Sequence, residues 1–91
     1  MKYTEKKLAI MPYAQAHVRV YDDGTIQLIS YTTVVVTVNS QGWLSCHGLY
    51  SQTTRRHISV FMAEYTHADY YTAKMCYEKS VEYNIYTGEI K

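Results

Sequence analysis

Near residue 50 the hydrophobic pattern of this chain changes its period. Upstream, apolar residues alternate with polar ones, as they do along strands that have one buried face. Downstream, apolar residues recur about every 3.6 positions, which is the spacing of one helix face. That helix face consists of Thr54, Ile58, Phe61, Met62 and Tyr65. The change predicts a helix that begins after a cap at Ser51 or Thr53, ends near Tyr65 and covers the apolar face of a sheet.

The sheet is predicted from the residues before that helix. Residues 14–21 alternate and end at a turn sequence, 22–24, whose glycine tolerates positive φ. Residues 25–39 contain no glycine or proline and keep one alternation. They predict a single long strand, bent or bulged at 30–33, where the inward residues become polar. Two shorter strands are the alternative, but no usual turn residue separates them.

The rest of the chain extends the sheet and adds a second helix. A turn at 39–42 leads into a third strand at 43–50. Asp69 is a suitable cap for a second helix that ends near Lys79. The inner stripe of that helix is predicted to be Tyr70, Ala73, Cys76 and Tyr77. Alternation returns at 81–86, which predicts a fourth strand or a small terminal ribbon.

These elements predict one α+β domain with the order β-β-β-α-α-β. Its three- to four-stranded antiparallel meander has two helices packed on one face. Residues 13–91 form this domain, and residues 1–12 are predicted to be an N-terminal extension that is partly frayed. A chain of 91 residues can bury a single modest core.

The composition argues against several classes of protein. A net charge of +1 gives no overall field that would attract nucleic acid. No apolar run approaches the roughly 18 residues that span a membrane, which predicts a cytoplasmic protein. The four histidines match no zinc-binding spacing, and no glycine-rich phosphate loop is present. We therefore expect no metal, no cofactor and no catalysis.

The cysteines also give no catalytic signature. Cys46 and Cys76 lack the spacing of a metal or redox motif, and we expect both to be buried free thiols. Cys46 is followed by His47, but adjacent residues of a strand point to opposite faces. These two side chains are therefore not expected to act together as a nucleophile and its base.

The first helix begins with two cations in an unusual place. Arg55 and Arg56 lie in the first turn, where the helix dipole favours acids, and no acidic residue follows three or four positions later. One interpretation is that they form an anion site together with Thr53 and Thr54. The other is that they point into water or meet acids from elsewhere in the fold, namely Asp22, Asp23, Glu78, Glu82 or Glu89.

Two binding hypotheses follow. In the first, the protein binds another protein, because the chain has eleven tyrosines and because Tyr, Trp and Arg dominate interface energetics. The predicted contact residues are Arg55, Arg56, Thr53, Thr54, Tyr50, Trp43, Tyr70 and Tyr71. In the second, the sheet lies in a nucleic-acid groove while the two arginines grip phosphates. The first is favoured, since Arg19 is the only basic residue in the three predicted strands. Exposed sheet edges are also compatible with a homodimer.

Several segments of the chain carry a resemblance. They are residues 28–35, 48–58, 70–74 and 86–90, and the most specific is Leu-Tyr-Ser-x-Thr-Thr-Arg-Arg-His at 49–57. Over roughly residues 16–90 the chain resembles a family of short uncharacterised proteins carried by phages, plasmids and integrative elements of Firmicutes. The resemblance brings no established activity. It implies a small accessory protein of a mobile element, and such proteins are often stoichiometric inhibitors of host defence, including anti-CRISPR proteins, which act by binding.

Overall fold

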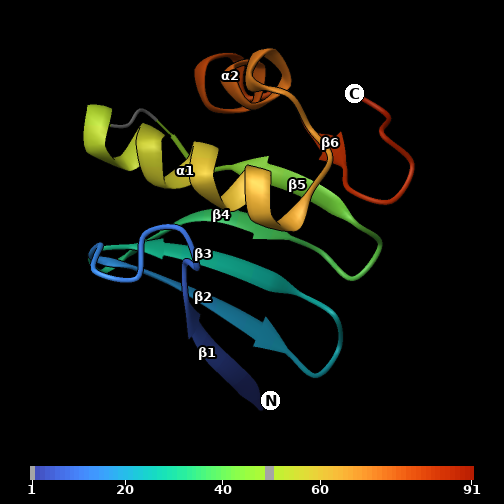
Figure 1. The fold of residues 1–91 in the computed structure, drawn as a ribbon. Coiled ribbons are helices and arrows are strands. Elements are labelled where there is room, and N and C mark those ends of the chain that lie inside the picture. Colours follow the sequence, from blue (N-terminus) through green and yellow to red (C-terminus); the bar gives the residue numbers. More distant parts are fainter. Residues whose placement is uncertain (1, 49–50) are drawn as a thin grey trace.

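The computed structural model describes residues 2–48 and 51–91, and in them an antiparallel sheet carries two helices on one face (Figure 1). The sheet has six strands in the spatial order β1-β2-β3-β4-β5-β6. The elements are β1 Tyr3–Lys7, β2 Ala16–Tyr21, β3 Ile26–Ser30, β4 Thr33–Val38, β5 Trp43–Cys46, α1 Gln52–Tyr65, α2 Tyr70–Lys79 and β6 Tyr83–Asn84. The predicted α+β class, meander and helix order are confirmed, and the sheet is larger than expected.

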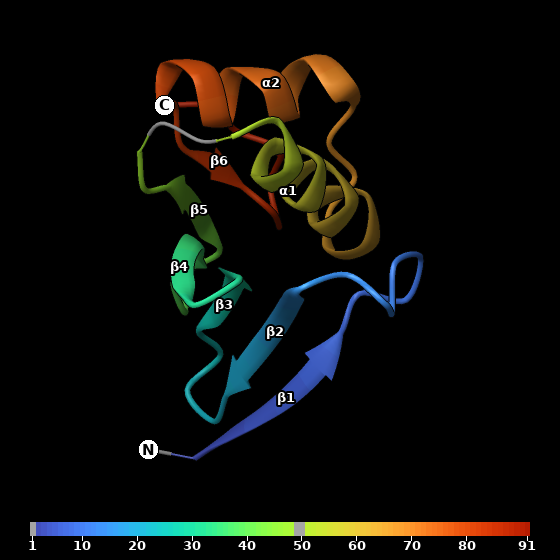
Figure 2. The same cartoon turned by 90° about the vertical axis from the view of Figure 1, so that its left-hand side faces the viewer.

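The core lies between the sheet and α1, as the hydrophobic pattern predicts. Val18, Leu28 and Val36 lie side by side on neighbouring strands and are fully buried. α1 crosses this face, and α2 lies on the far side of α1 and packs against β5 (Figure 2). The buried side chains of α1 are Thr54, His57, Ile58, Phe61 and Met62. The predicted stripe of α1 therefore packs against the sheet and forms the helical side of the core, with the exception of Tyr65, which is only partly buried.

The helix caps form at the predicted residues. Ser51 accepts a hydrogen bond from the backbone N–H of Thr54, at 3.2 Å, and α1 begins at the next residue. Asp69 accepts one from the N–H of Thr72, at 2.8 Å, and this hydrogen bond lowers the pKa of the Asp69 carboxyl. Both helices thus begin where a side-chain oxygen satisfies an otherwise free amide.

The prediction of one long strand at 25–39 is wrong, and the alternative of two strands is correct. β3 and β4 form a hairpin in which Ser30 lies opposite Thr33, with a bulge between Leu28 and Ile29. The turn uses Tyr31, whose φ is +58°. A side chain in this region costs about 1–2 kcal/mol. The N–H of Tyr31 donates to the carbonyl of Gln15 at 2.7 Å, which ties the strained residue to the neighbouring loop.

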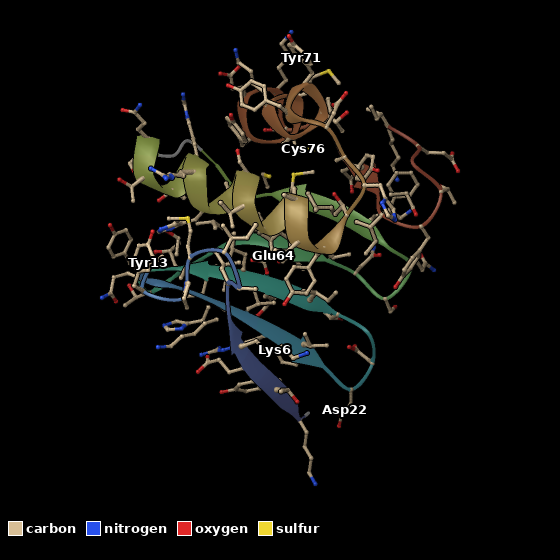
Figure 3. All side chains as sticks on the ribbon, in the orientation of Figure 1. Lys6, Tyr13, Asp22, Glu64, Tyr71 and Cys76 are labelled. Carbon is tan, nitrogen blue, oxygen red and sulfur yellow. The ribbon has the colours of Figure 1, made fainter. Side chains whose placement is uncertain are left out.

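The predicted boundary at residue 12 does not set the N-terminus apart from the sheet. Tyr3–Lys7 pairs along its length with β2, and Leu8 is fully buried in the core. All five residues of β1 are exposed, because the helices do not reach this end of the sheet (Figure 3). The strand therefore lacks the alternation by which the others were predicted. It is held by backbone hydrogen bonds to β2.

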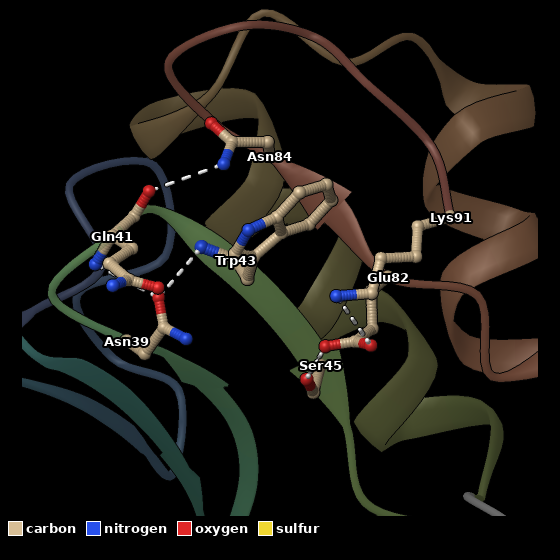
Figure 4. Close-up of polar contacts among 7 residues, drawn as sticks. All are labelled: Asn39, Gln41, Trp43, Ser45, Glu82, Asn84 and Lys91. Atoms are coloured by element: carbon tan, nitrogen blue, oxygen red, sulfur yellow. Dashed lines mark hydrogen bonds and ion pairs between the residues drawn. The ribbon is translucent and has the colours of Figure 1, made fainter.

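The last strand is shorter than the prediction and is held by polar contacts (Figure 4). Asn84 donates to the carbonyl of Gln41 at 3.2 Å, and its Oδ1 atom accepts from the N–H groups of Tyr86 and Thr87. Glu82 accepts from Ser45. These contacts fasten the C-terminal residues to the β4–β5 hairpin.

Candidate functional site

A groove between α1 and α2 gathers basic and aromatic side chains. Its volume is about 480 Å³. α1 contributes Gln52, Arg55, Arg56 and Ser59, and α2 contributes Tyr70, Lys74, Tyr77 and Glu78. We call the space lined by these residues the interhelical groove. It brings together three of the predicted contact residues, namely Arg55, Arg56 and Tyr70.

The orientation of α1 on the sheet places Arg55 at the groove. Thr54 and Ile58 are buried on that face, and Arg55 follows one position farther around the helix, on the side that lines the groove with α2. The Cζ atom of Arg55 lies 5.8 Å from the centroid of the Tyr77 ring. Tyr77 is itself buried, so the guanidinium rests on a wall that the fold holds in place.

The Nε atom of Arg55 is buried and has no hydrogen-bond partner among residues 2–48 and 51–91. A buried donor without an acceptor is uncommon in folded proteins and costs about 1–3 kcal/mol. An acceptor brought by another molecule would remove that cost. Among the groove residues, Arg55 is therefore the one with a buried hydrogen-bond donor that lacks an acceptor in the described structure.

Neither groove arginine forms an ion pair within the described part of the chain. The ion pairs found there are Arg19–Glu5 and Lys91–Glu82. Glu78 lines the groove but pairs with neither arginine there. With Lys74 on the opposite wall, the groove has an excess of positive charge.

The groove also has neutral hydrogen-bonding groups. Burial raises the pKa of Tyr77, a hydrogen bond from Ser59 lowers it by less, and the neighbouring Tyr70 and Glu78 raise it further. The phenol of Tyr77 therefore stays protonated at neutral pH. Tyr70 is 60% exposed, which corrects its predicted place in the inner stripe of α2.

Comparison with known proteins identifies the family to which the chain belongs. The family of unknown function DUF8033 matches residues 2–79. The chain belongs to DUF8033. The match includes every residue that lines the interhelical groove, and it also includes β1, which lies before the predicted domain boundary at residue 13. No curated protein and no solved structure matches the chain.

The other predicted contact residues of this DUF8033 protein lie elsewhere. Tyr71 is 75% exposed and lies on the side of α2 away from the sheet (Figure 3). Thr53 is exposed and lines a neighbouring hollow of about 400 Å³ together with Arg56. Trp43 is half-buried near the C-terminal residues, where the Nζ atom of Lys91 lies 4.5 Å from its ring centroid. Tyr50 lies outside the described residues.

Thr54 belongs to a buried polar cluster that joins α1 to the sheet. Its hydroxyl lies 3.1 Å from that of Ser30 and accepts a hydrogen bond from Ser51. Ser30 Oγ also lies 3.0 Å from Nδ1 of His57, which is only 2% exposed. Burial lowers the pKa of His57, and the charge of Arg56 lowers it further. Thr54 therefore fixes the helix in position and does not form part of the groove.

Lys74 is the basic groove residue that was not predicted from the sequence; the polar residues Gln52 and Ser59 were not predicted either. Lys74 lies four positions after Tyr70, so both side chains fall on one face of α2. The spacing was a signal that Tyr70 and Lys74 share one face of α2. The spacing does not show how α2 packs on α1, and this packing places Lys74 across the groove from Arg55 and Arg56.

The pKa values of both cysteine thiols are raised. Burial raises the pKa of the Cys46 thiol to about 12, with a smaller contribution from Cys76, whose own pKa is raised by burial to about 11. Both thiols are free and stay protonated at neutral pH. Residues 2–48 and 51–91 contain no cluster of three or more His, Cys, Asp or Glu side chains that could hold a metal. In the same residues, neither helix has the length and apolar character needed to cross a membrane.

Proposed function

We propose that this protein is a small non-catalytic binding protein that docks onto another protein through the interhelical groove. One observation carries the proposal: Arg55 and Arg56 line the groove without an ion pair to any described carboxylate. Arginines with intramolecular partners would be structural. Arginines without them are available to a partner, and arginine is among the residues that contribute most to interface energy.

The aromatic residues around the groove support the same proposal. Tyr70 and Tyr71 are exposed neighbours whose ring centroids lie 5.9 Å apart in an edge-to-face arrangement. Tyrosine gives a large contact area at a low cost in side-chain entropy. Tyr70 lines the groove and Tyr71 lies beside it, so a partner that enters the groove between α1 and α2 can also cover this ring pair.

The resemblance to proteins of phages, plasmids and integrative elements suggests the kind of partner. We propose that the protein comes from such an element, acts in the cytoplasm of a bacterial host, and inhibits a host defence complex by stoichiometric binding, as anti-CRISPR proteins do. This part of the proposal rests on the resemblance, whereas the location of the binding surface rests on the groove.

The arrangement of the molecule favours a protein partner over nucleic acid. In the nucleic-acid alternative, the sheet and the two arginines grip the same duplex. α1 lies against one face of the sheet, with α2 on its far side (Figure 2), and Arg55 and Arg56 line the groove between the two helices. The uncovered face of the sheet is therefore on the other side of the molecule from the groove. One straight duplex would not contact both that face and the two arginines.

The test of the proposed function is comparative capture from a Firmicutes lysate. Protein tagged ahead of β1, a strand that lies away from the helices (Figure 1), is compared with the double variant Arg55→Ala/Arg56→Ala and with the control Lys6→Ala/Lys7→Ala. The control removes the same charge from β1. We expect the groove variant to lose its specific partner and the control to keep it. An equal catch from all three proteins would contradict the proposal.

Nucleic-acid binding is measured with the same three proteins. Binding to duplex DNA is titrated at about 50 mM and about 200 mM salt, because phosphate contacts weaken steeply over this interval. We expect no specific binding at the lower salt concentration. Tight binding that is lost in the groove variant would establish the nucleic-acid alternative.

A further inference from the structure

The interhelical groove contains a hydrogen-bond donor without an acceptor, the Nε atom of Arg55, and this donor indicates which chemical group the groove binds. The Nε atom is buried and has no acceptor among the described residues, although the Tyr77 ring lies beside the guanidinium. A ring face attracts the cation, but it does not supply the in-plane lone pair that an N–H group needs. None of the described residues supplies that lone pair.

The charges around Arg55 select the kind of acceptor. Arg56 and Lys74 also line the groove, and Glu78 is the one acid that does so among the described residues. An anionic oxygen makes a hydrogen bond roughly twice as strong as that of a neutral one and suits the planar donors of arginine. These charges favour an oxyanion over a neutral acceptor.

The size and walls of the groove favour a peptide over a small ion. A volume of about 480 Å³ is in the range of sites that hold a drug-sized molecule. Its cations come from two helices, and its walls include Gln52, Ser59 and Tyr70, which can bond to peptide groups. These features fit several residues of chain better than one compact anion.

We infer that the interhelical groove binds an acidic peptide segment of the partner protein, with one carboxylate bonded to Arg55 and neighbouring carboxylates near Arg56 and Lys74. This inference rests on the proposed function and names the chemistry that the partner must present. Arg55 is the central contact because it alone combines burial with an unmet donor. Arg56 is more exposed, and its role is to attract the acidic segment and steer it.

The inference is tested by nuclear magnetic resonance on the intact chain. A hexaglutamate peptide is the probe, a hexalysine peptide is the charge-reversed control, and inorganic phosphate is the small-ion arm. The readout is the Nε–Hε signal of Arg55 together with the backbone amides of α1 and α2. We expect hexaglutamate to shift the Arg55 signal in a saturable way, because the orphaned donor gains an acceptor.

Matched variants locate the interaction. Arg55→Lys keeps the charge but removes the buried Nε donor, and we expect it to weaken hexaglutamate binding about tenfold or more, the equivalent of one charge-assisted hydrogen bond. Arg56→Lys should weaken binding by less. Lys6→Gln, on β1, is the control for net charge and should leave the affinity within about twofold, because an exposed charge far from the site is largely screened.

Three results would overturn the inference. The first is a hexaglutamate response spread evenly over the basic residues of β1 and the groove, which would indicate adventitious charge attraction. The second is an Arg55→Lys variant that binds the peptide as tightly as the parent protein. The third is phosphate that binds at least as tightly as the peptide, since the groove would then be a site for a single anion.

The outcome is separable from that of the capture experiment. If capture depends on Arg55 and Arg56 but hexaglutamate does not bind, the partner meets the groove with other chemistry, and only the inference fails. If hexaglutamate binds at Arg55 but capture is unchanged in the double variant, the groove is an acidic-peptide site that the captured partner does not use. The proposed function then fails.

Discussion

At the scale of single residues, the glycines with positive φ differ in what an added side chain would meet. Gly42, in the turn just before β5, has a φ of +93°, and a Cβ atom there would meet the ring of Tyr86 and lie 3.1 Å from Oδ1 of Asn84. Gly88 has a similar φ of +80°, but a Cβ atom there would meet nothing within 4 Å. Alanine substitutions at the two glycines therefore distinguish the cost of backbone strain from the cost of a steric clash.

We expect Gly42→Ala to destabilise the protein by about 2–4 kcal/mol, since the strain of a positive φ is joined by the cost of displacing a packed side chain. Gly88→Ala should cost only the strain, about 1–2 kcal/mol. Urea unfolding of both variants beside the parent protein measures the difference. Equal losses would mean that Tyr86 moves aside freely and does not hold the C-terminal residues to the hairpin.

At the scale of elements, α1 is the most informative part of the chain. One of its faces buries Ile58, Phe61 and Met62 against the sheet, and its first turns line the groove. The polar cluster of Ser30, Thr54 and His57 lies on the sheet-facing side of the helix and joins α1 to β3. A neutral His57 suits this cluster, because its ring can accept or donate at Nδ1 without carrying a buried charge.

The stability of the protein should fall as the pH drops below about 6.5. Burial lowers the pKa of His57 in the folded state, so the unfolded chain takes up a proton first as the pH falls from the ordinary value of 6.5. The contribution of this residue is fully present above that value and is lost as the pH falls toward the lowered pKa of the folded state. Urea unfolding at several pH values between about 7.5 and about 5 measures the slope.

The matched variants for this slope are His57→Asn and His67→Asn. An asparagine at 57 can still bond to Ser30 but does not titrate, so the variant should lose part of the pH dependence. His67 is exposed, and its variant should keep the slope of the parent protein. A slope unchanged in His57→Asn would place the titrating group elsewhere.

At the scale of the whole molecule, the sheet is closed at one edge and open at the other. β6 is short and joins the C-terminal residues, whereas β1 has no neighbour on its outer side in the described chain. Glu5, Lys6 and Lys7 occupy that open edge and are exposed. Charged side chains, lysine above all, discourage another strand from adding to an edge. A homodimer through this edge is therefore disfavoured.

Replacing the edge lysines should change this behaviour. We expect Lys6→Val/Lys7→Thr to self-associate, because the substitutions remove the charges that oppose strand addition. The control Lys74→Thr/Lys79→Thr removes the same charge from exposed positions of α2, away from β1, and should have the mass of the parent protein. Light scattering over a range of protein concentrations gives the mass of each. A variant that stays as small as the control would show that the lysines do not protect the edge.

The fold and the site were predictable to different degrees. Alternation and the stripe of α1 were sufficient to identify the strand-forming residues of the inner sheet and the helices, because burial on one face imposes a period on the sequence, but alternation did not divide β3 from β4. β1 buries no side chain of its own, and Tyr31 turns the chain without glycine, so neither left a pattern to find. Arg55 and Arg56 stood out by their local charge. Lys74 did not, since its place opposite them depends on how α2 packs on α1.

The place of Trp43 gives the protein a built-in optical reporter. It is the only tryptophan in the chain, and Lys91 lies over its ring. Its fluorescence should therefore follow the attachment of the last residues to the β4–β5 hairpin. Trp43 does not line the groove, so a partner that enters there should leave this emission largely unaltered, whereas release of the C-terminal segment should change it at once.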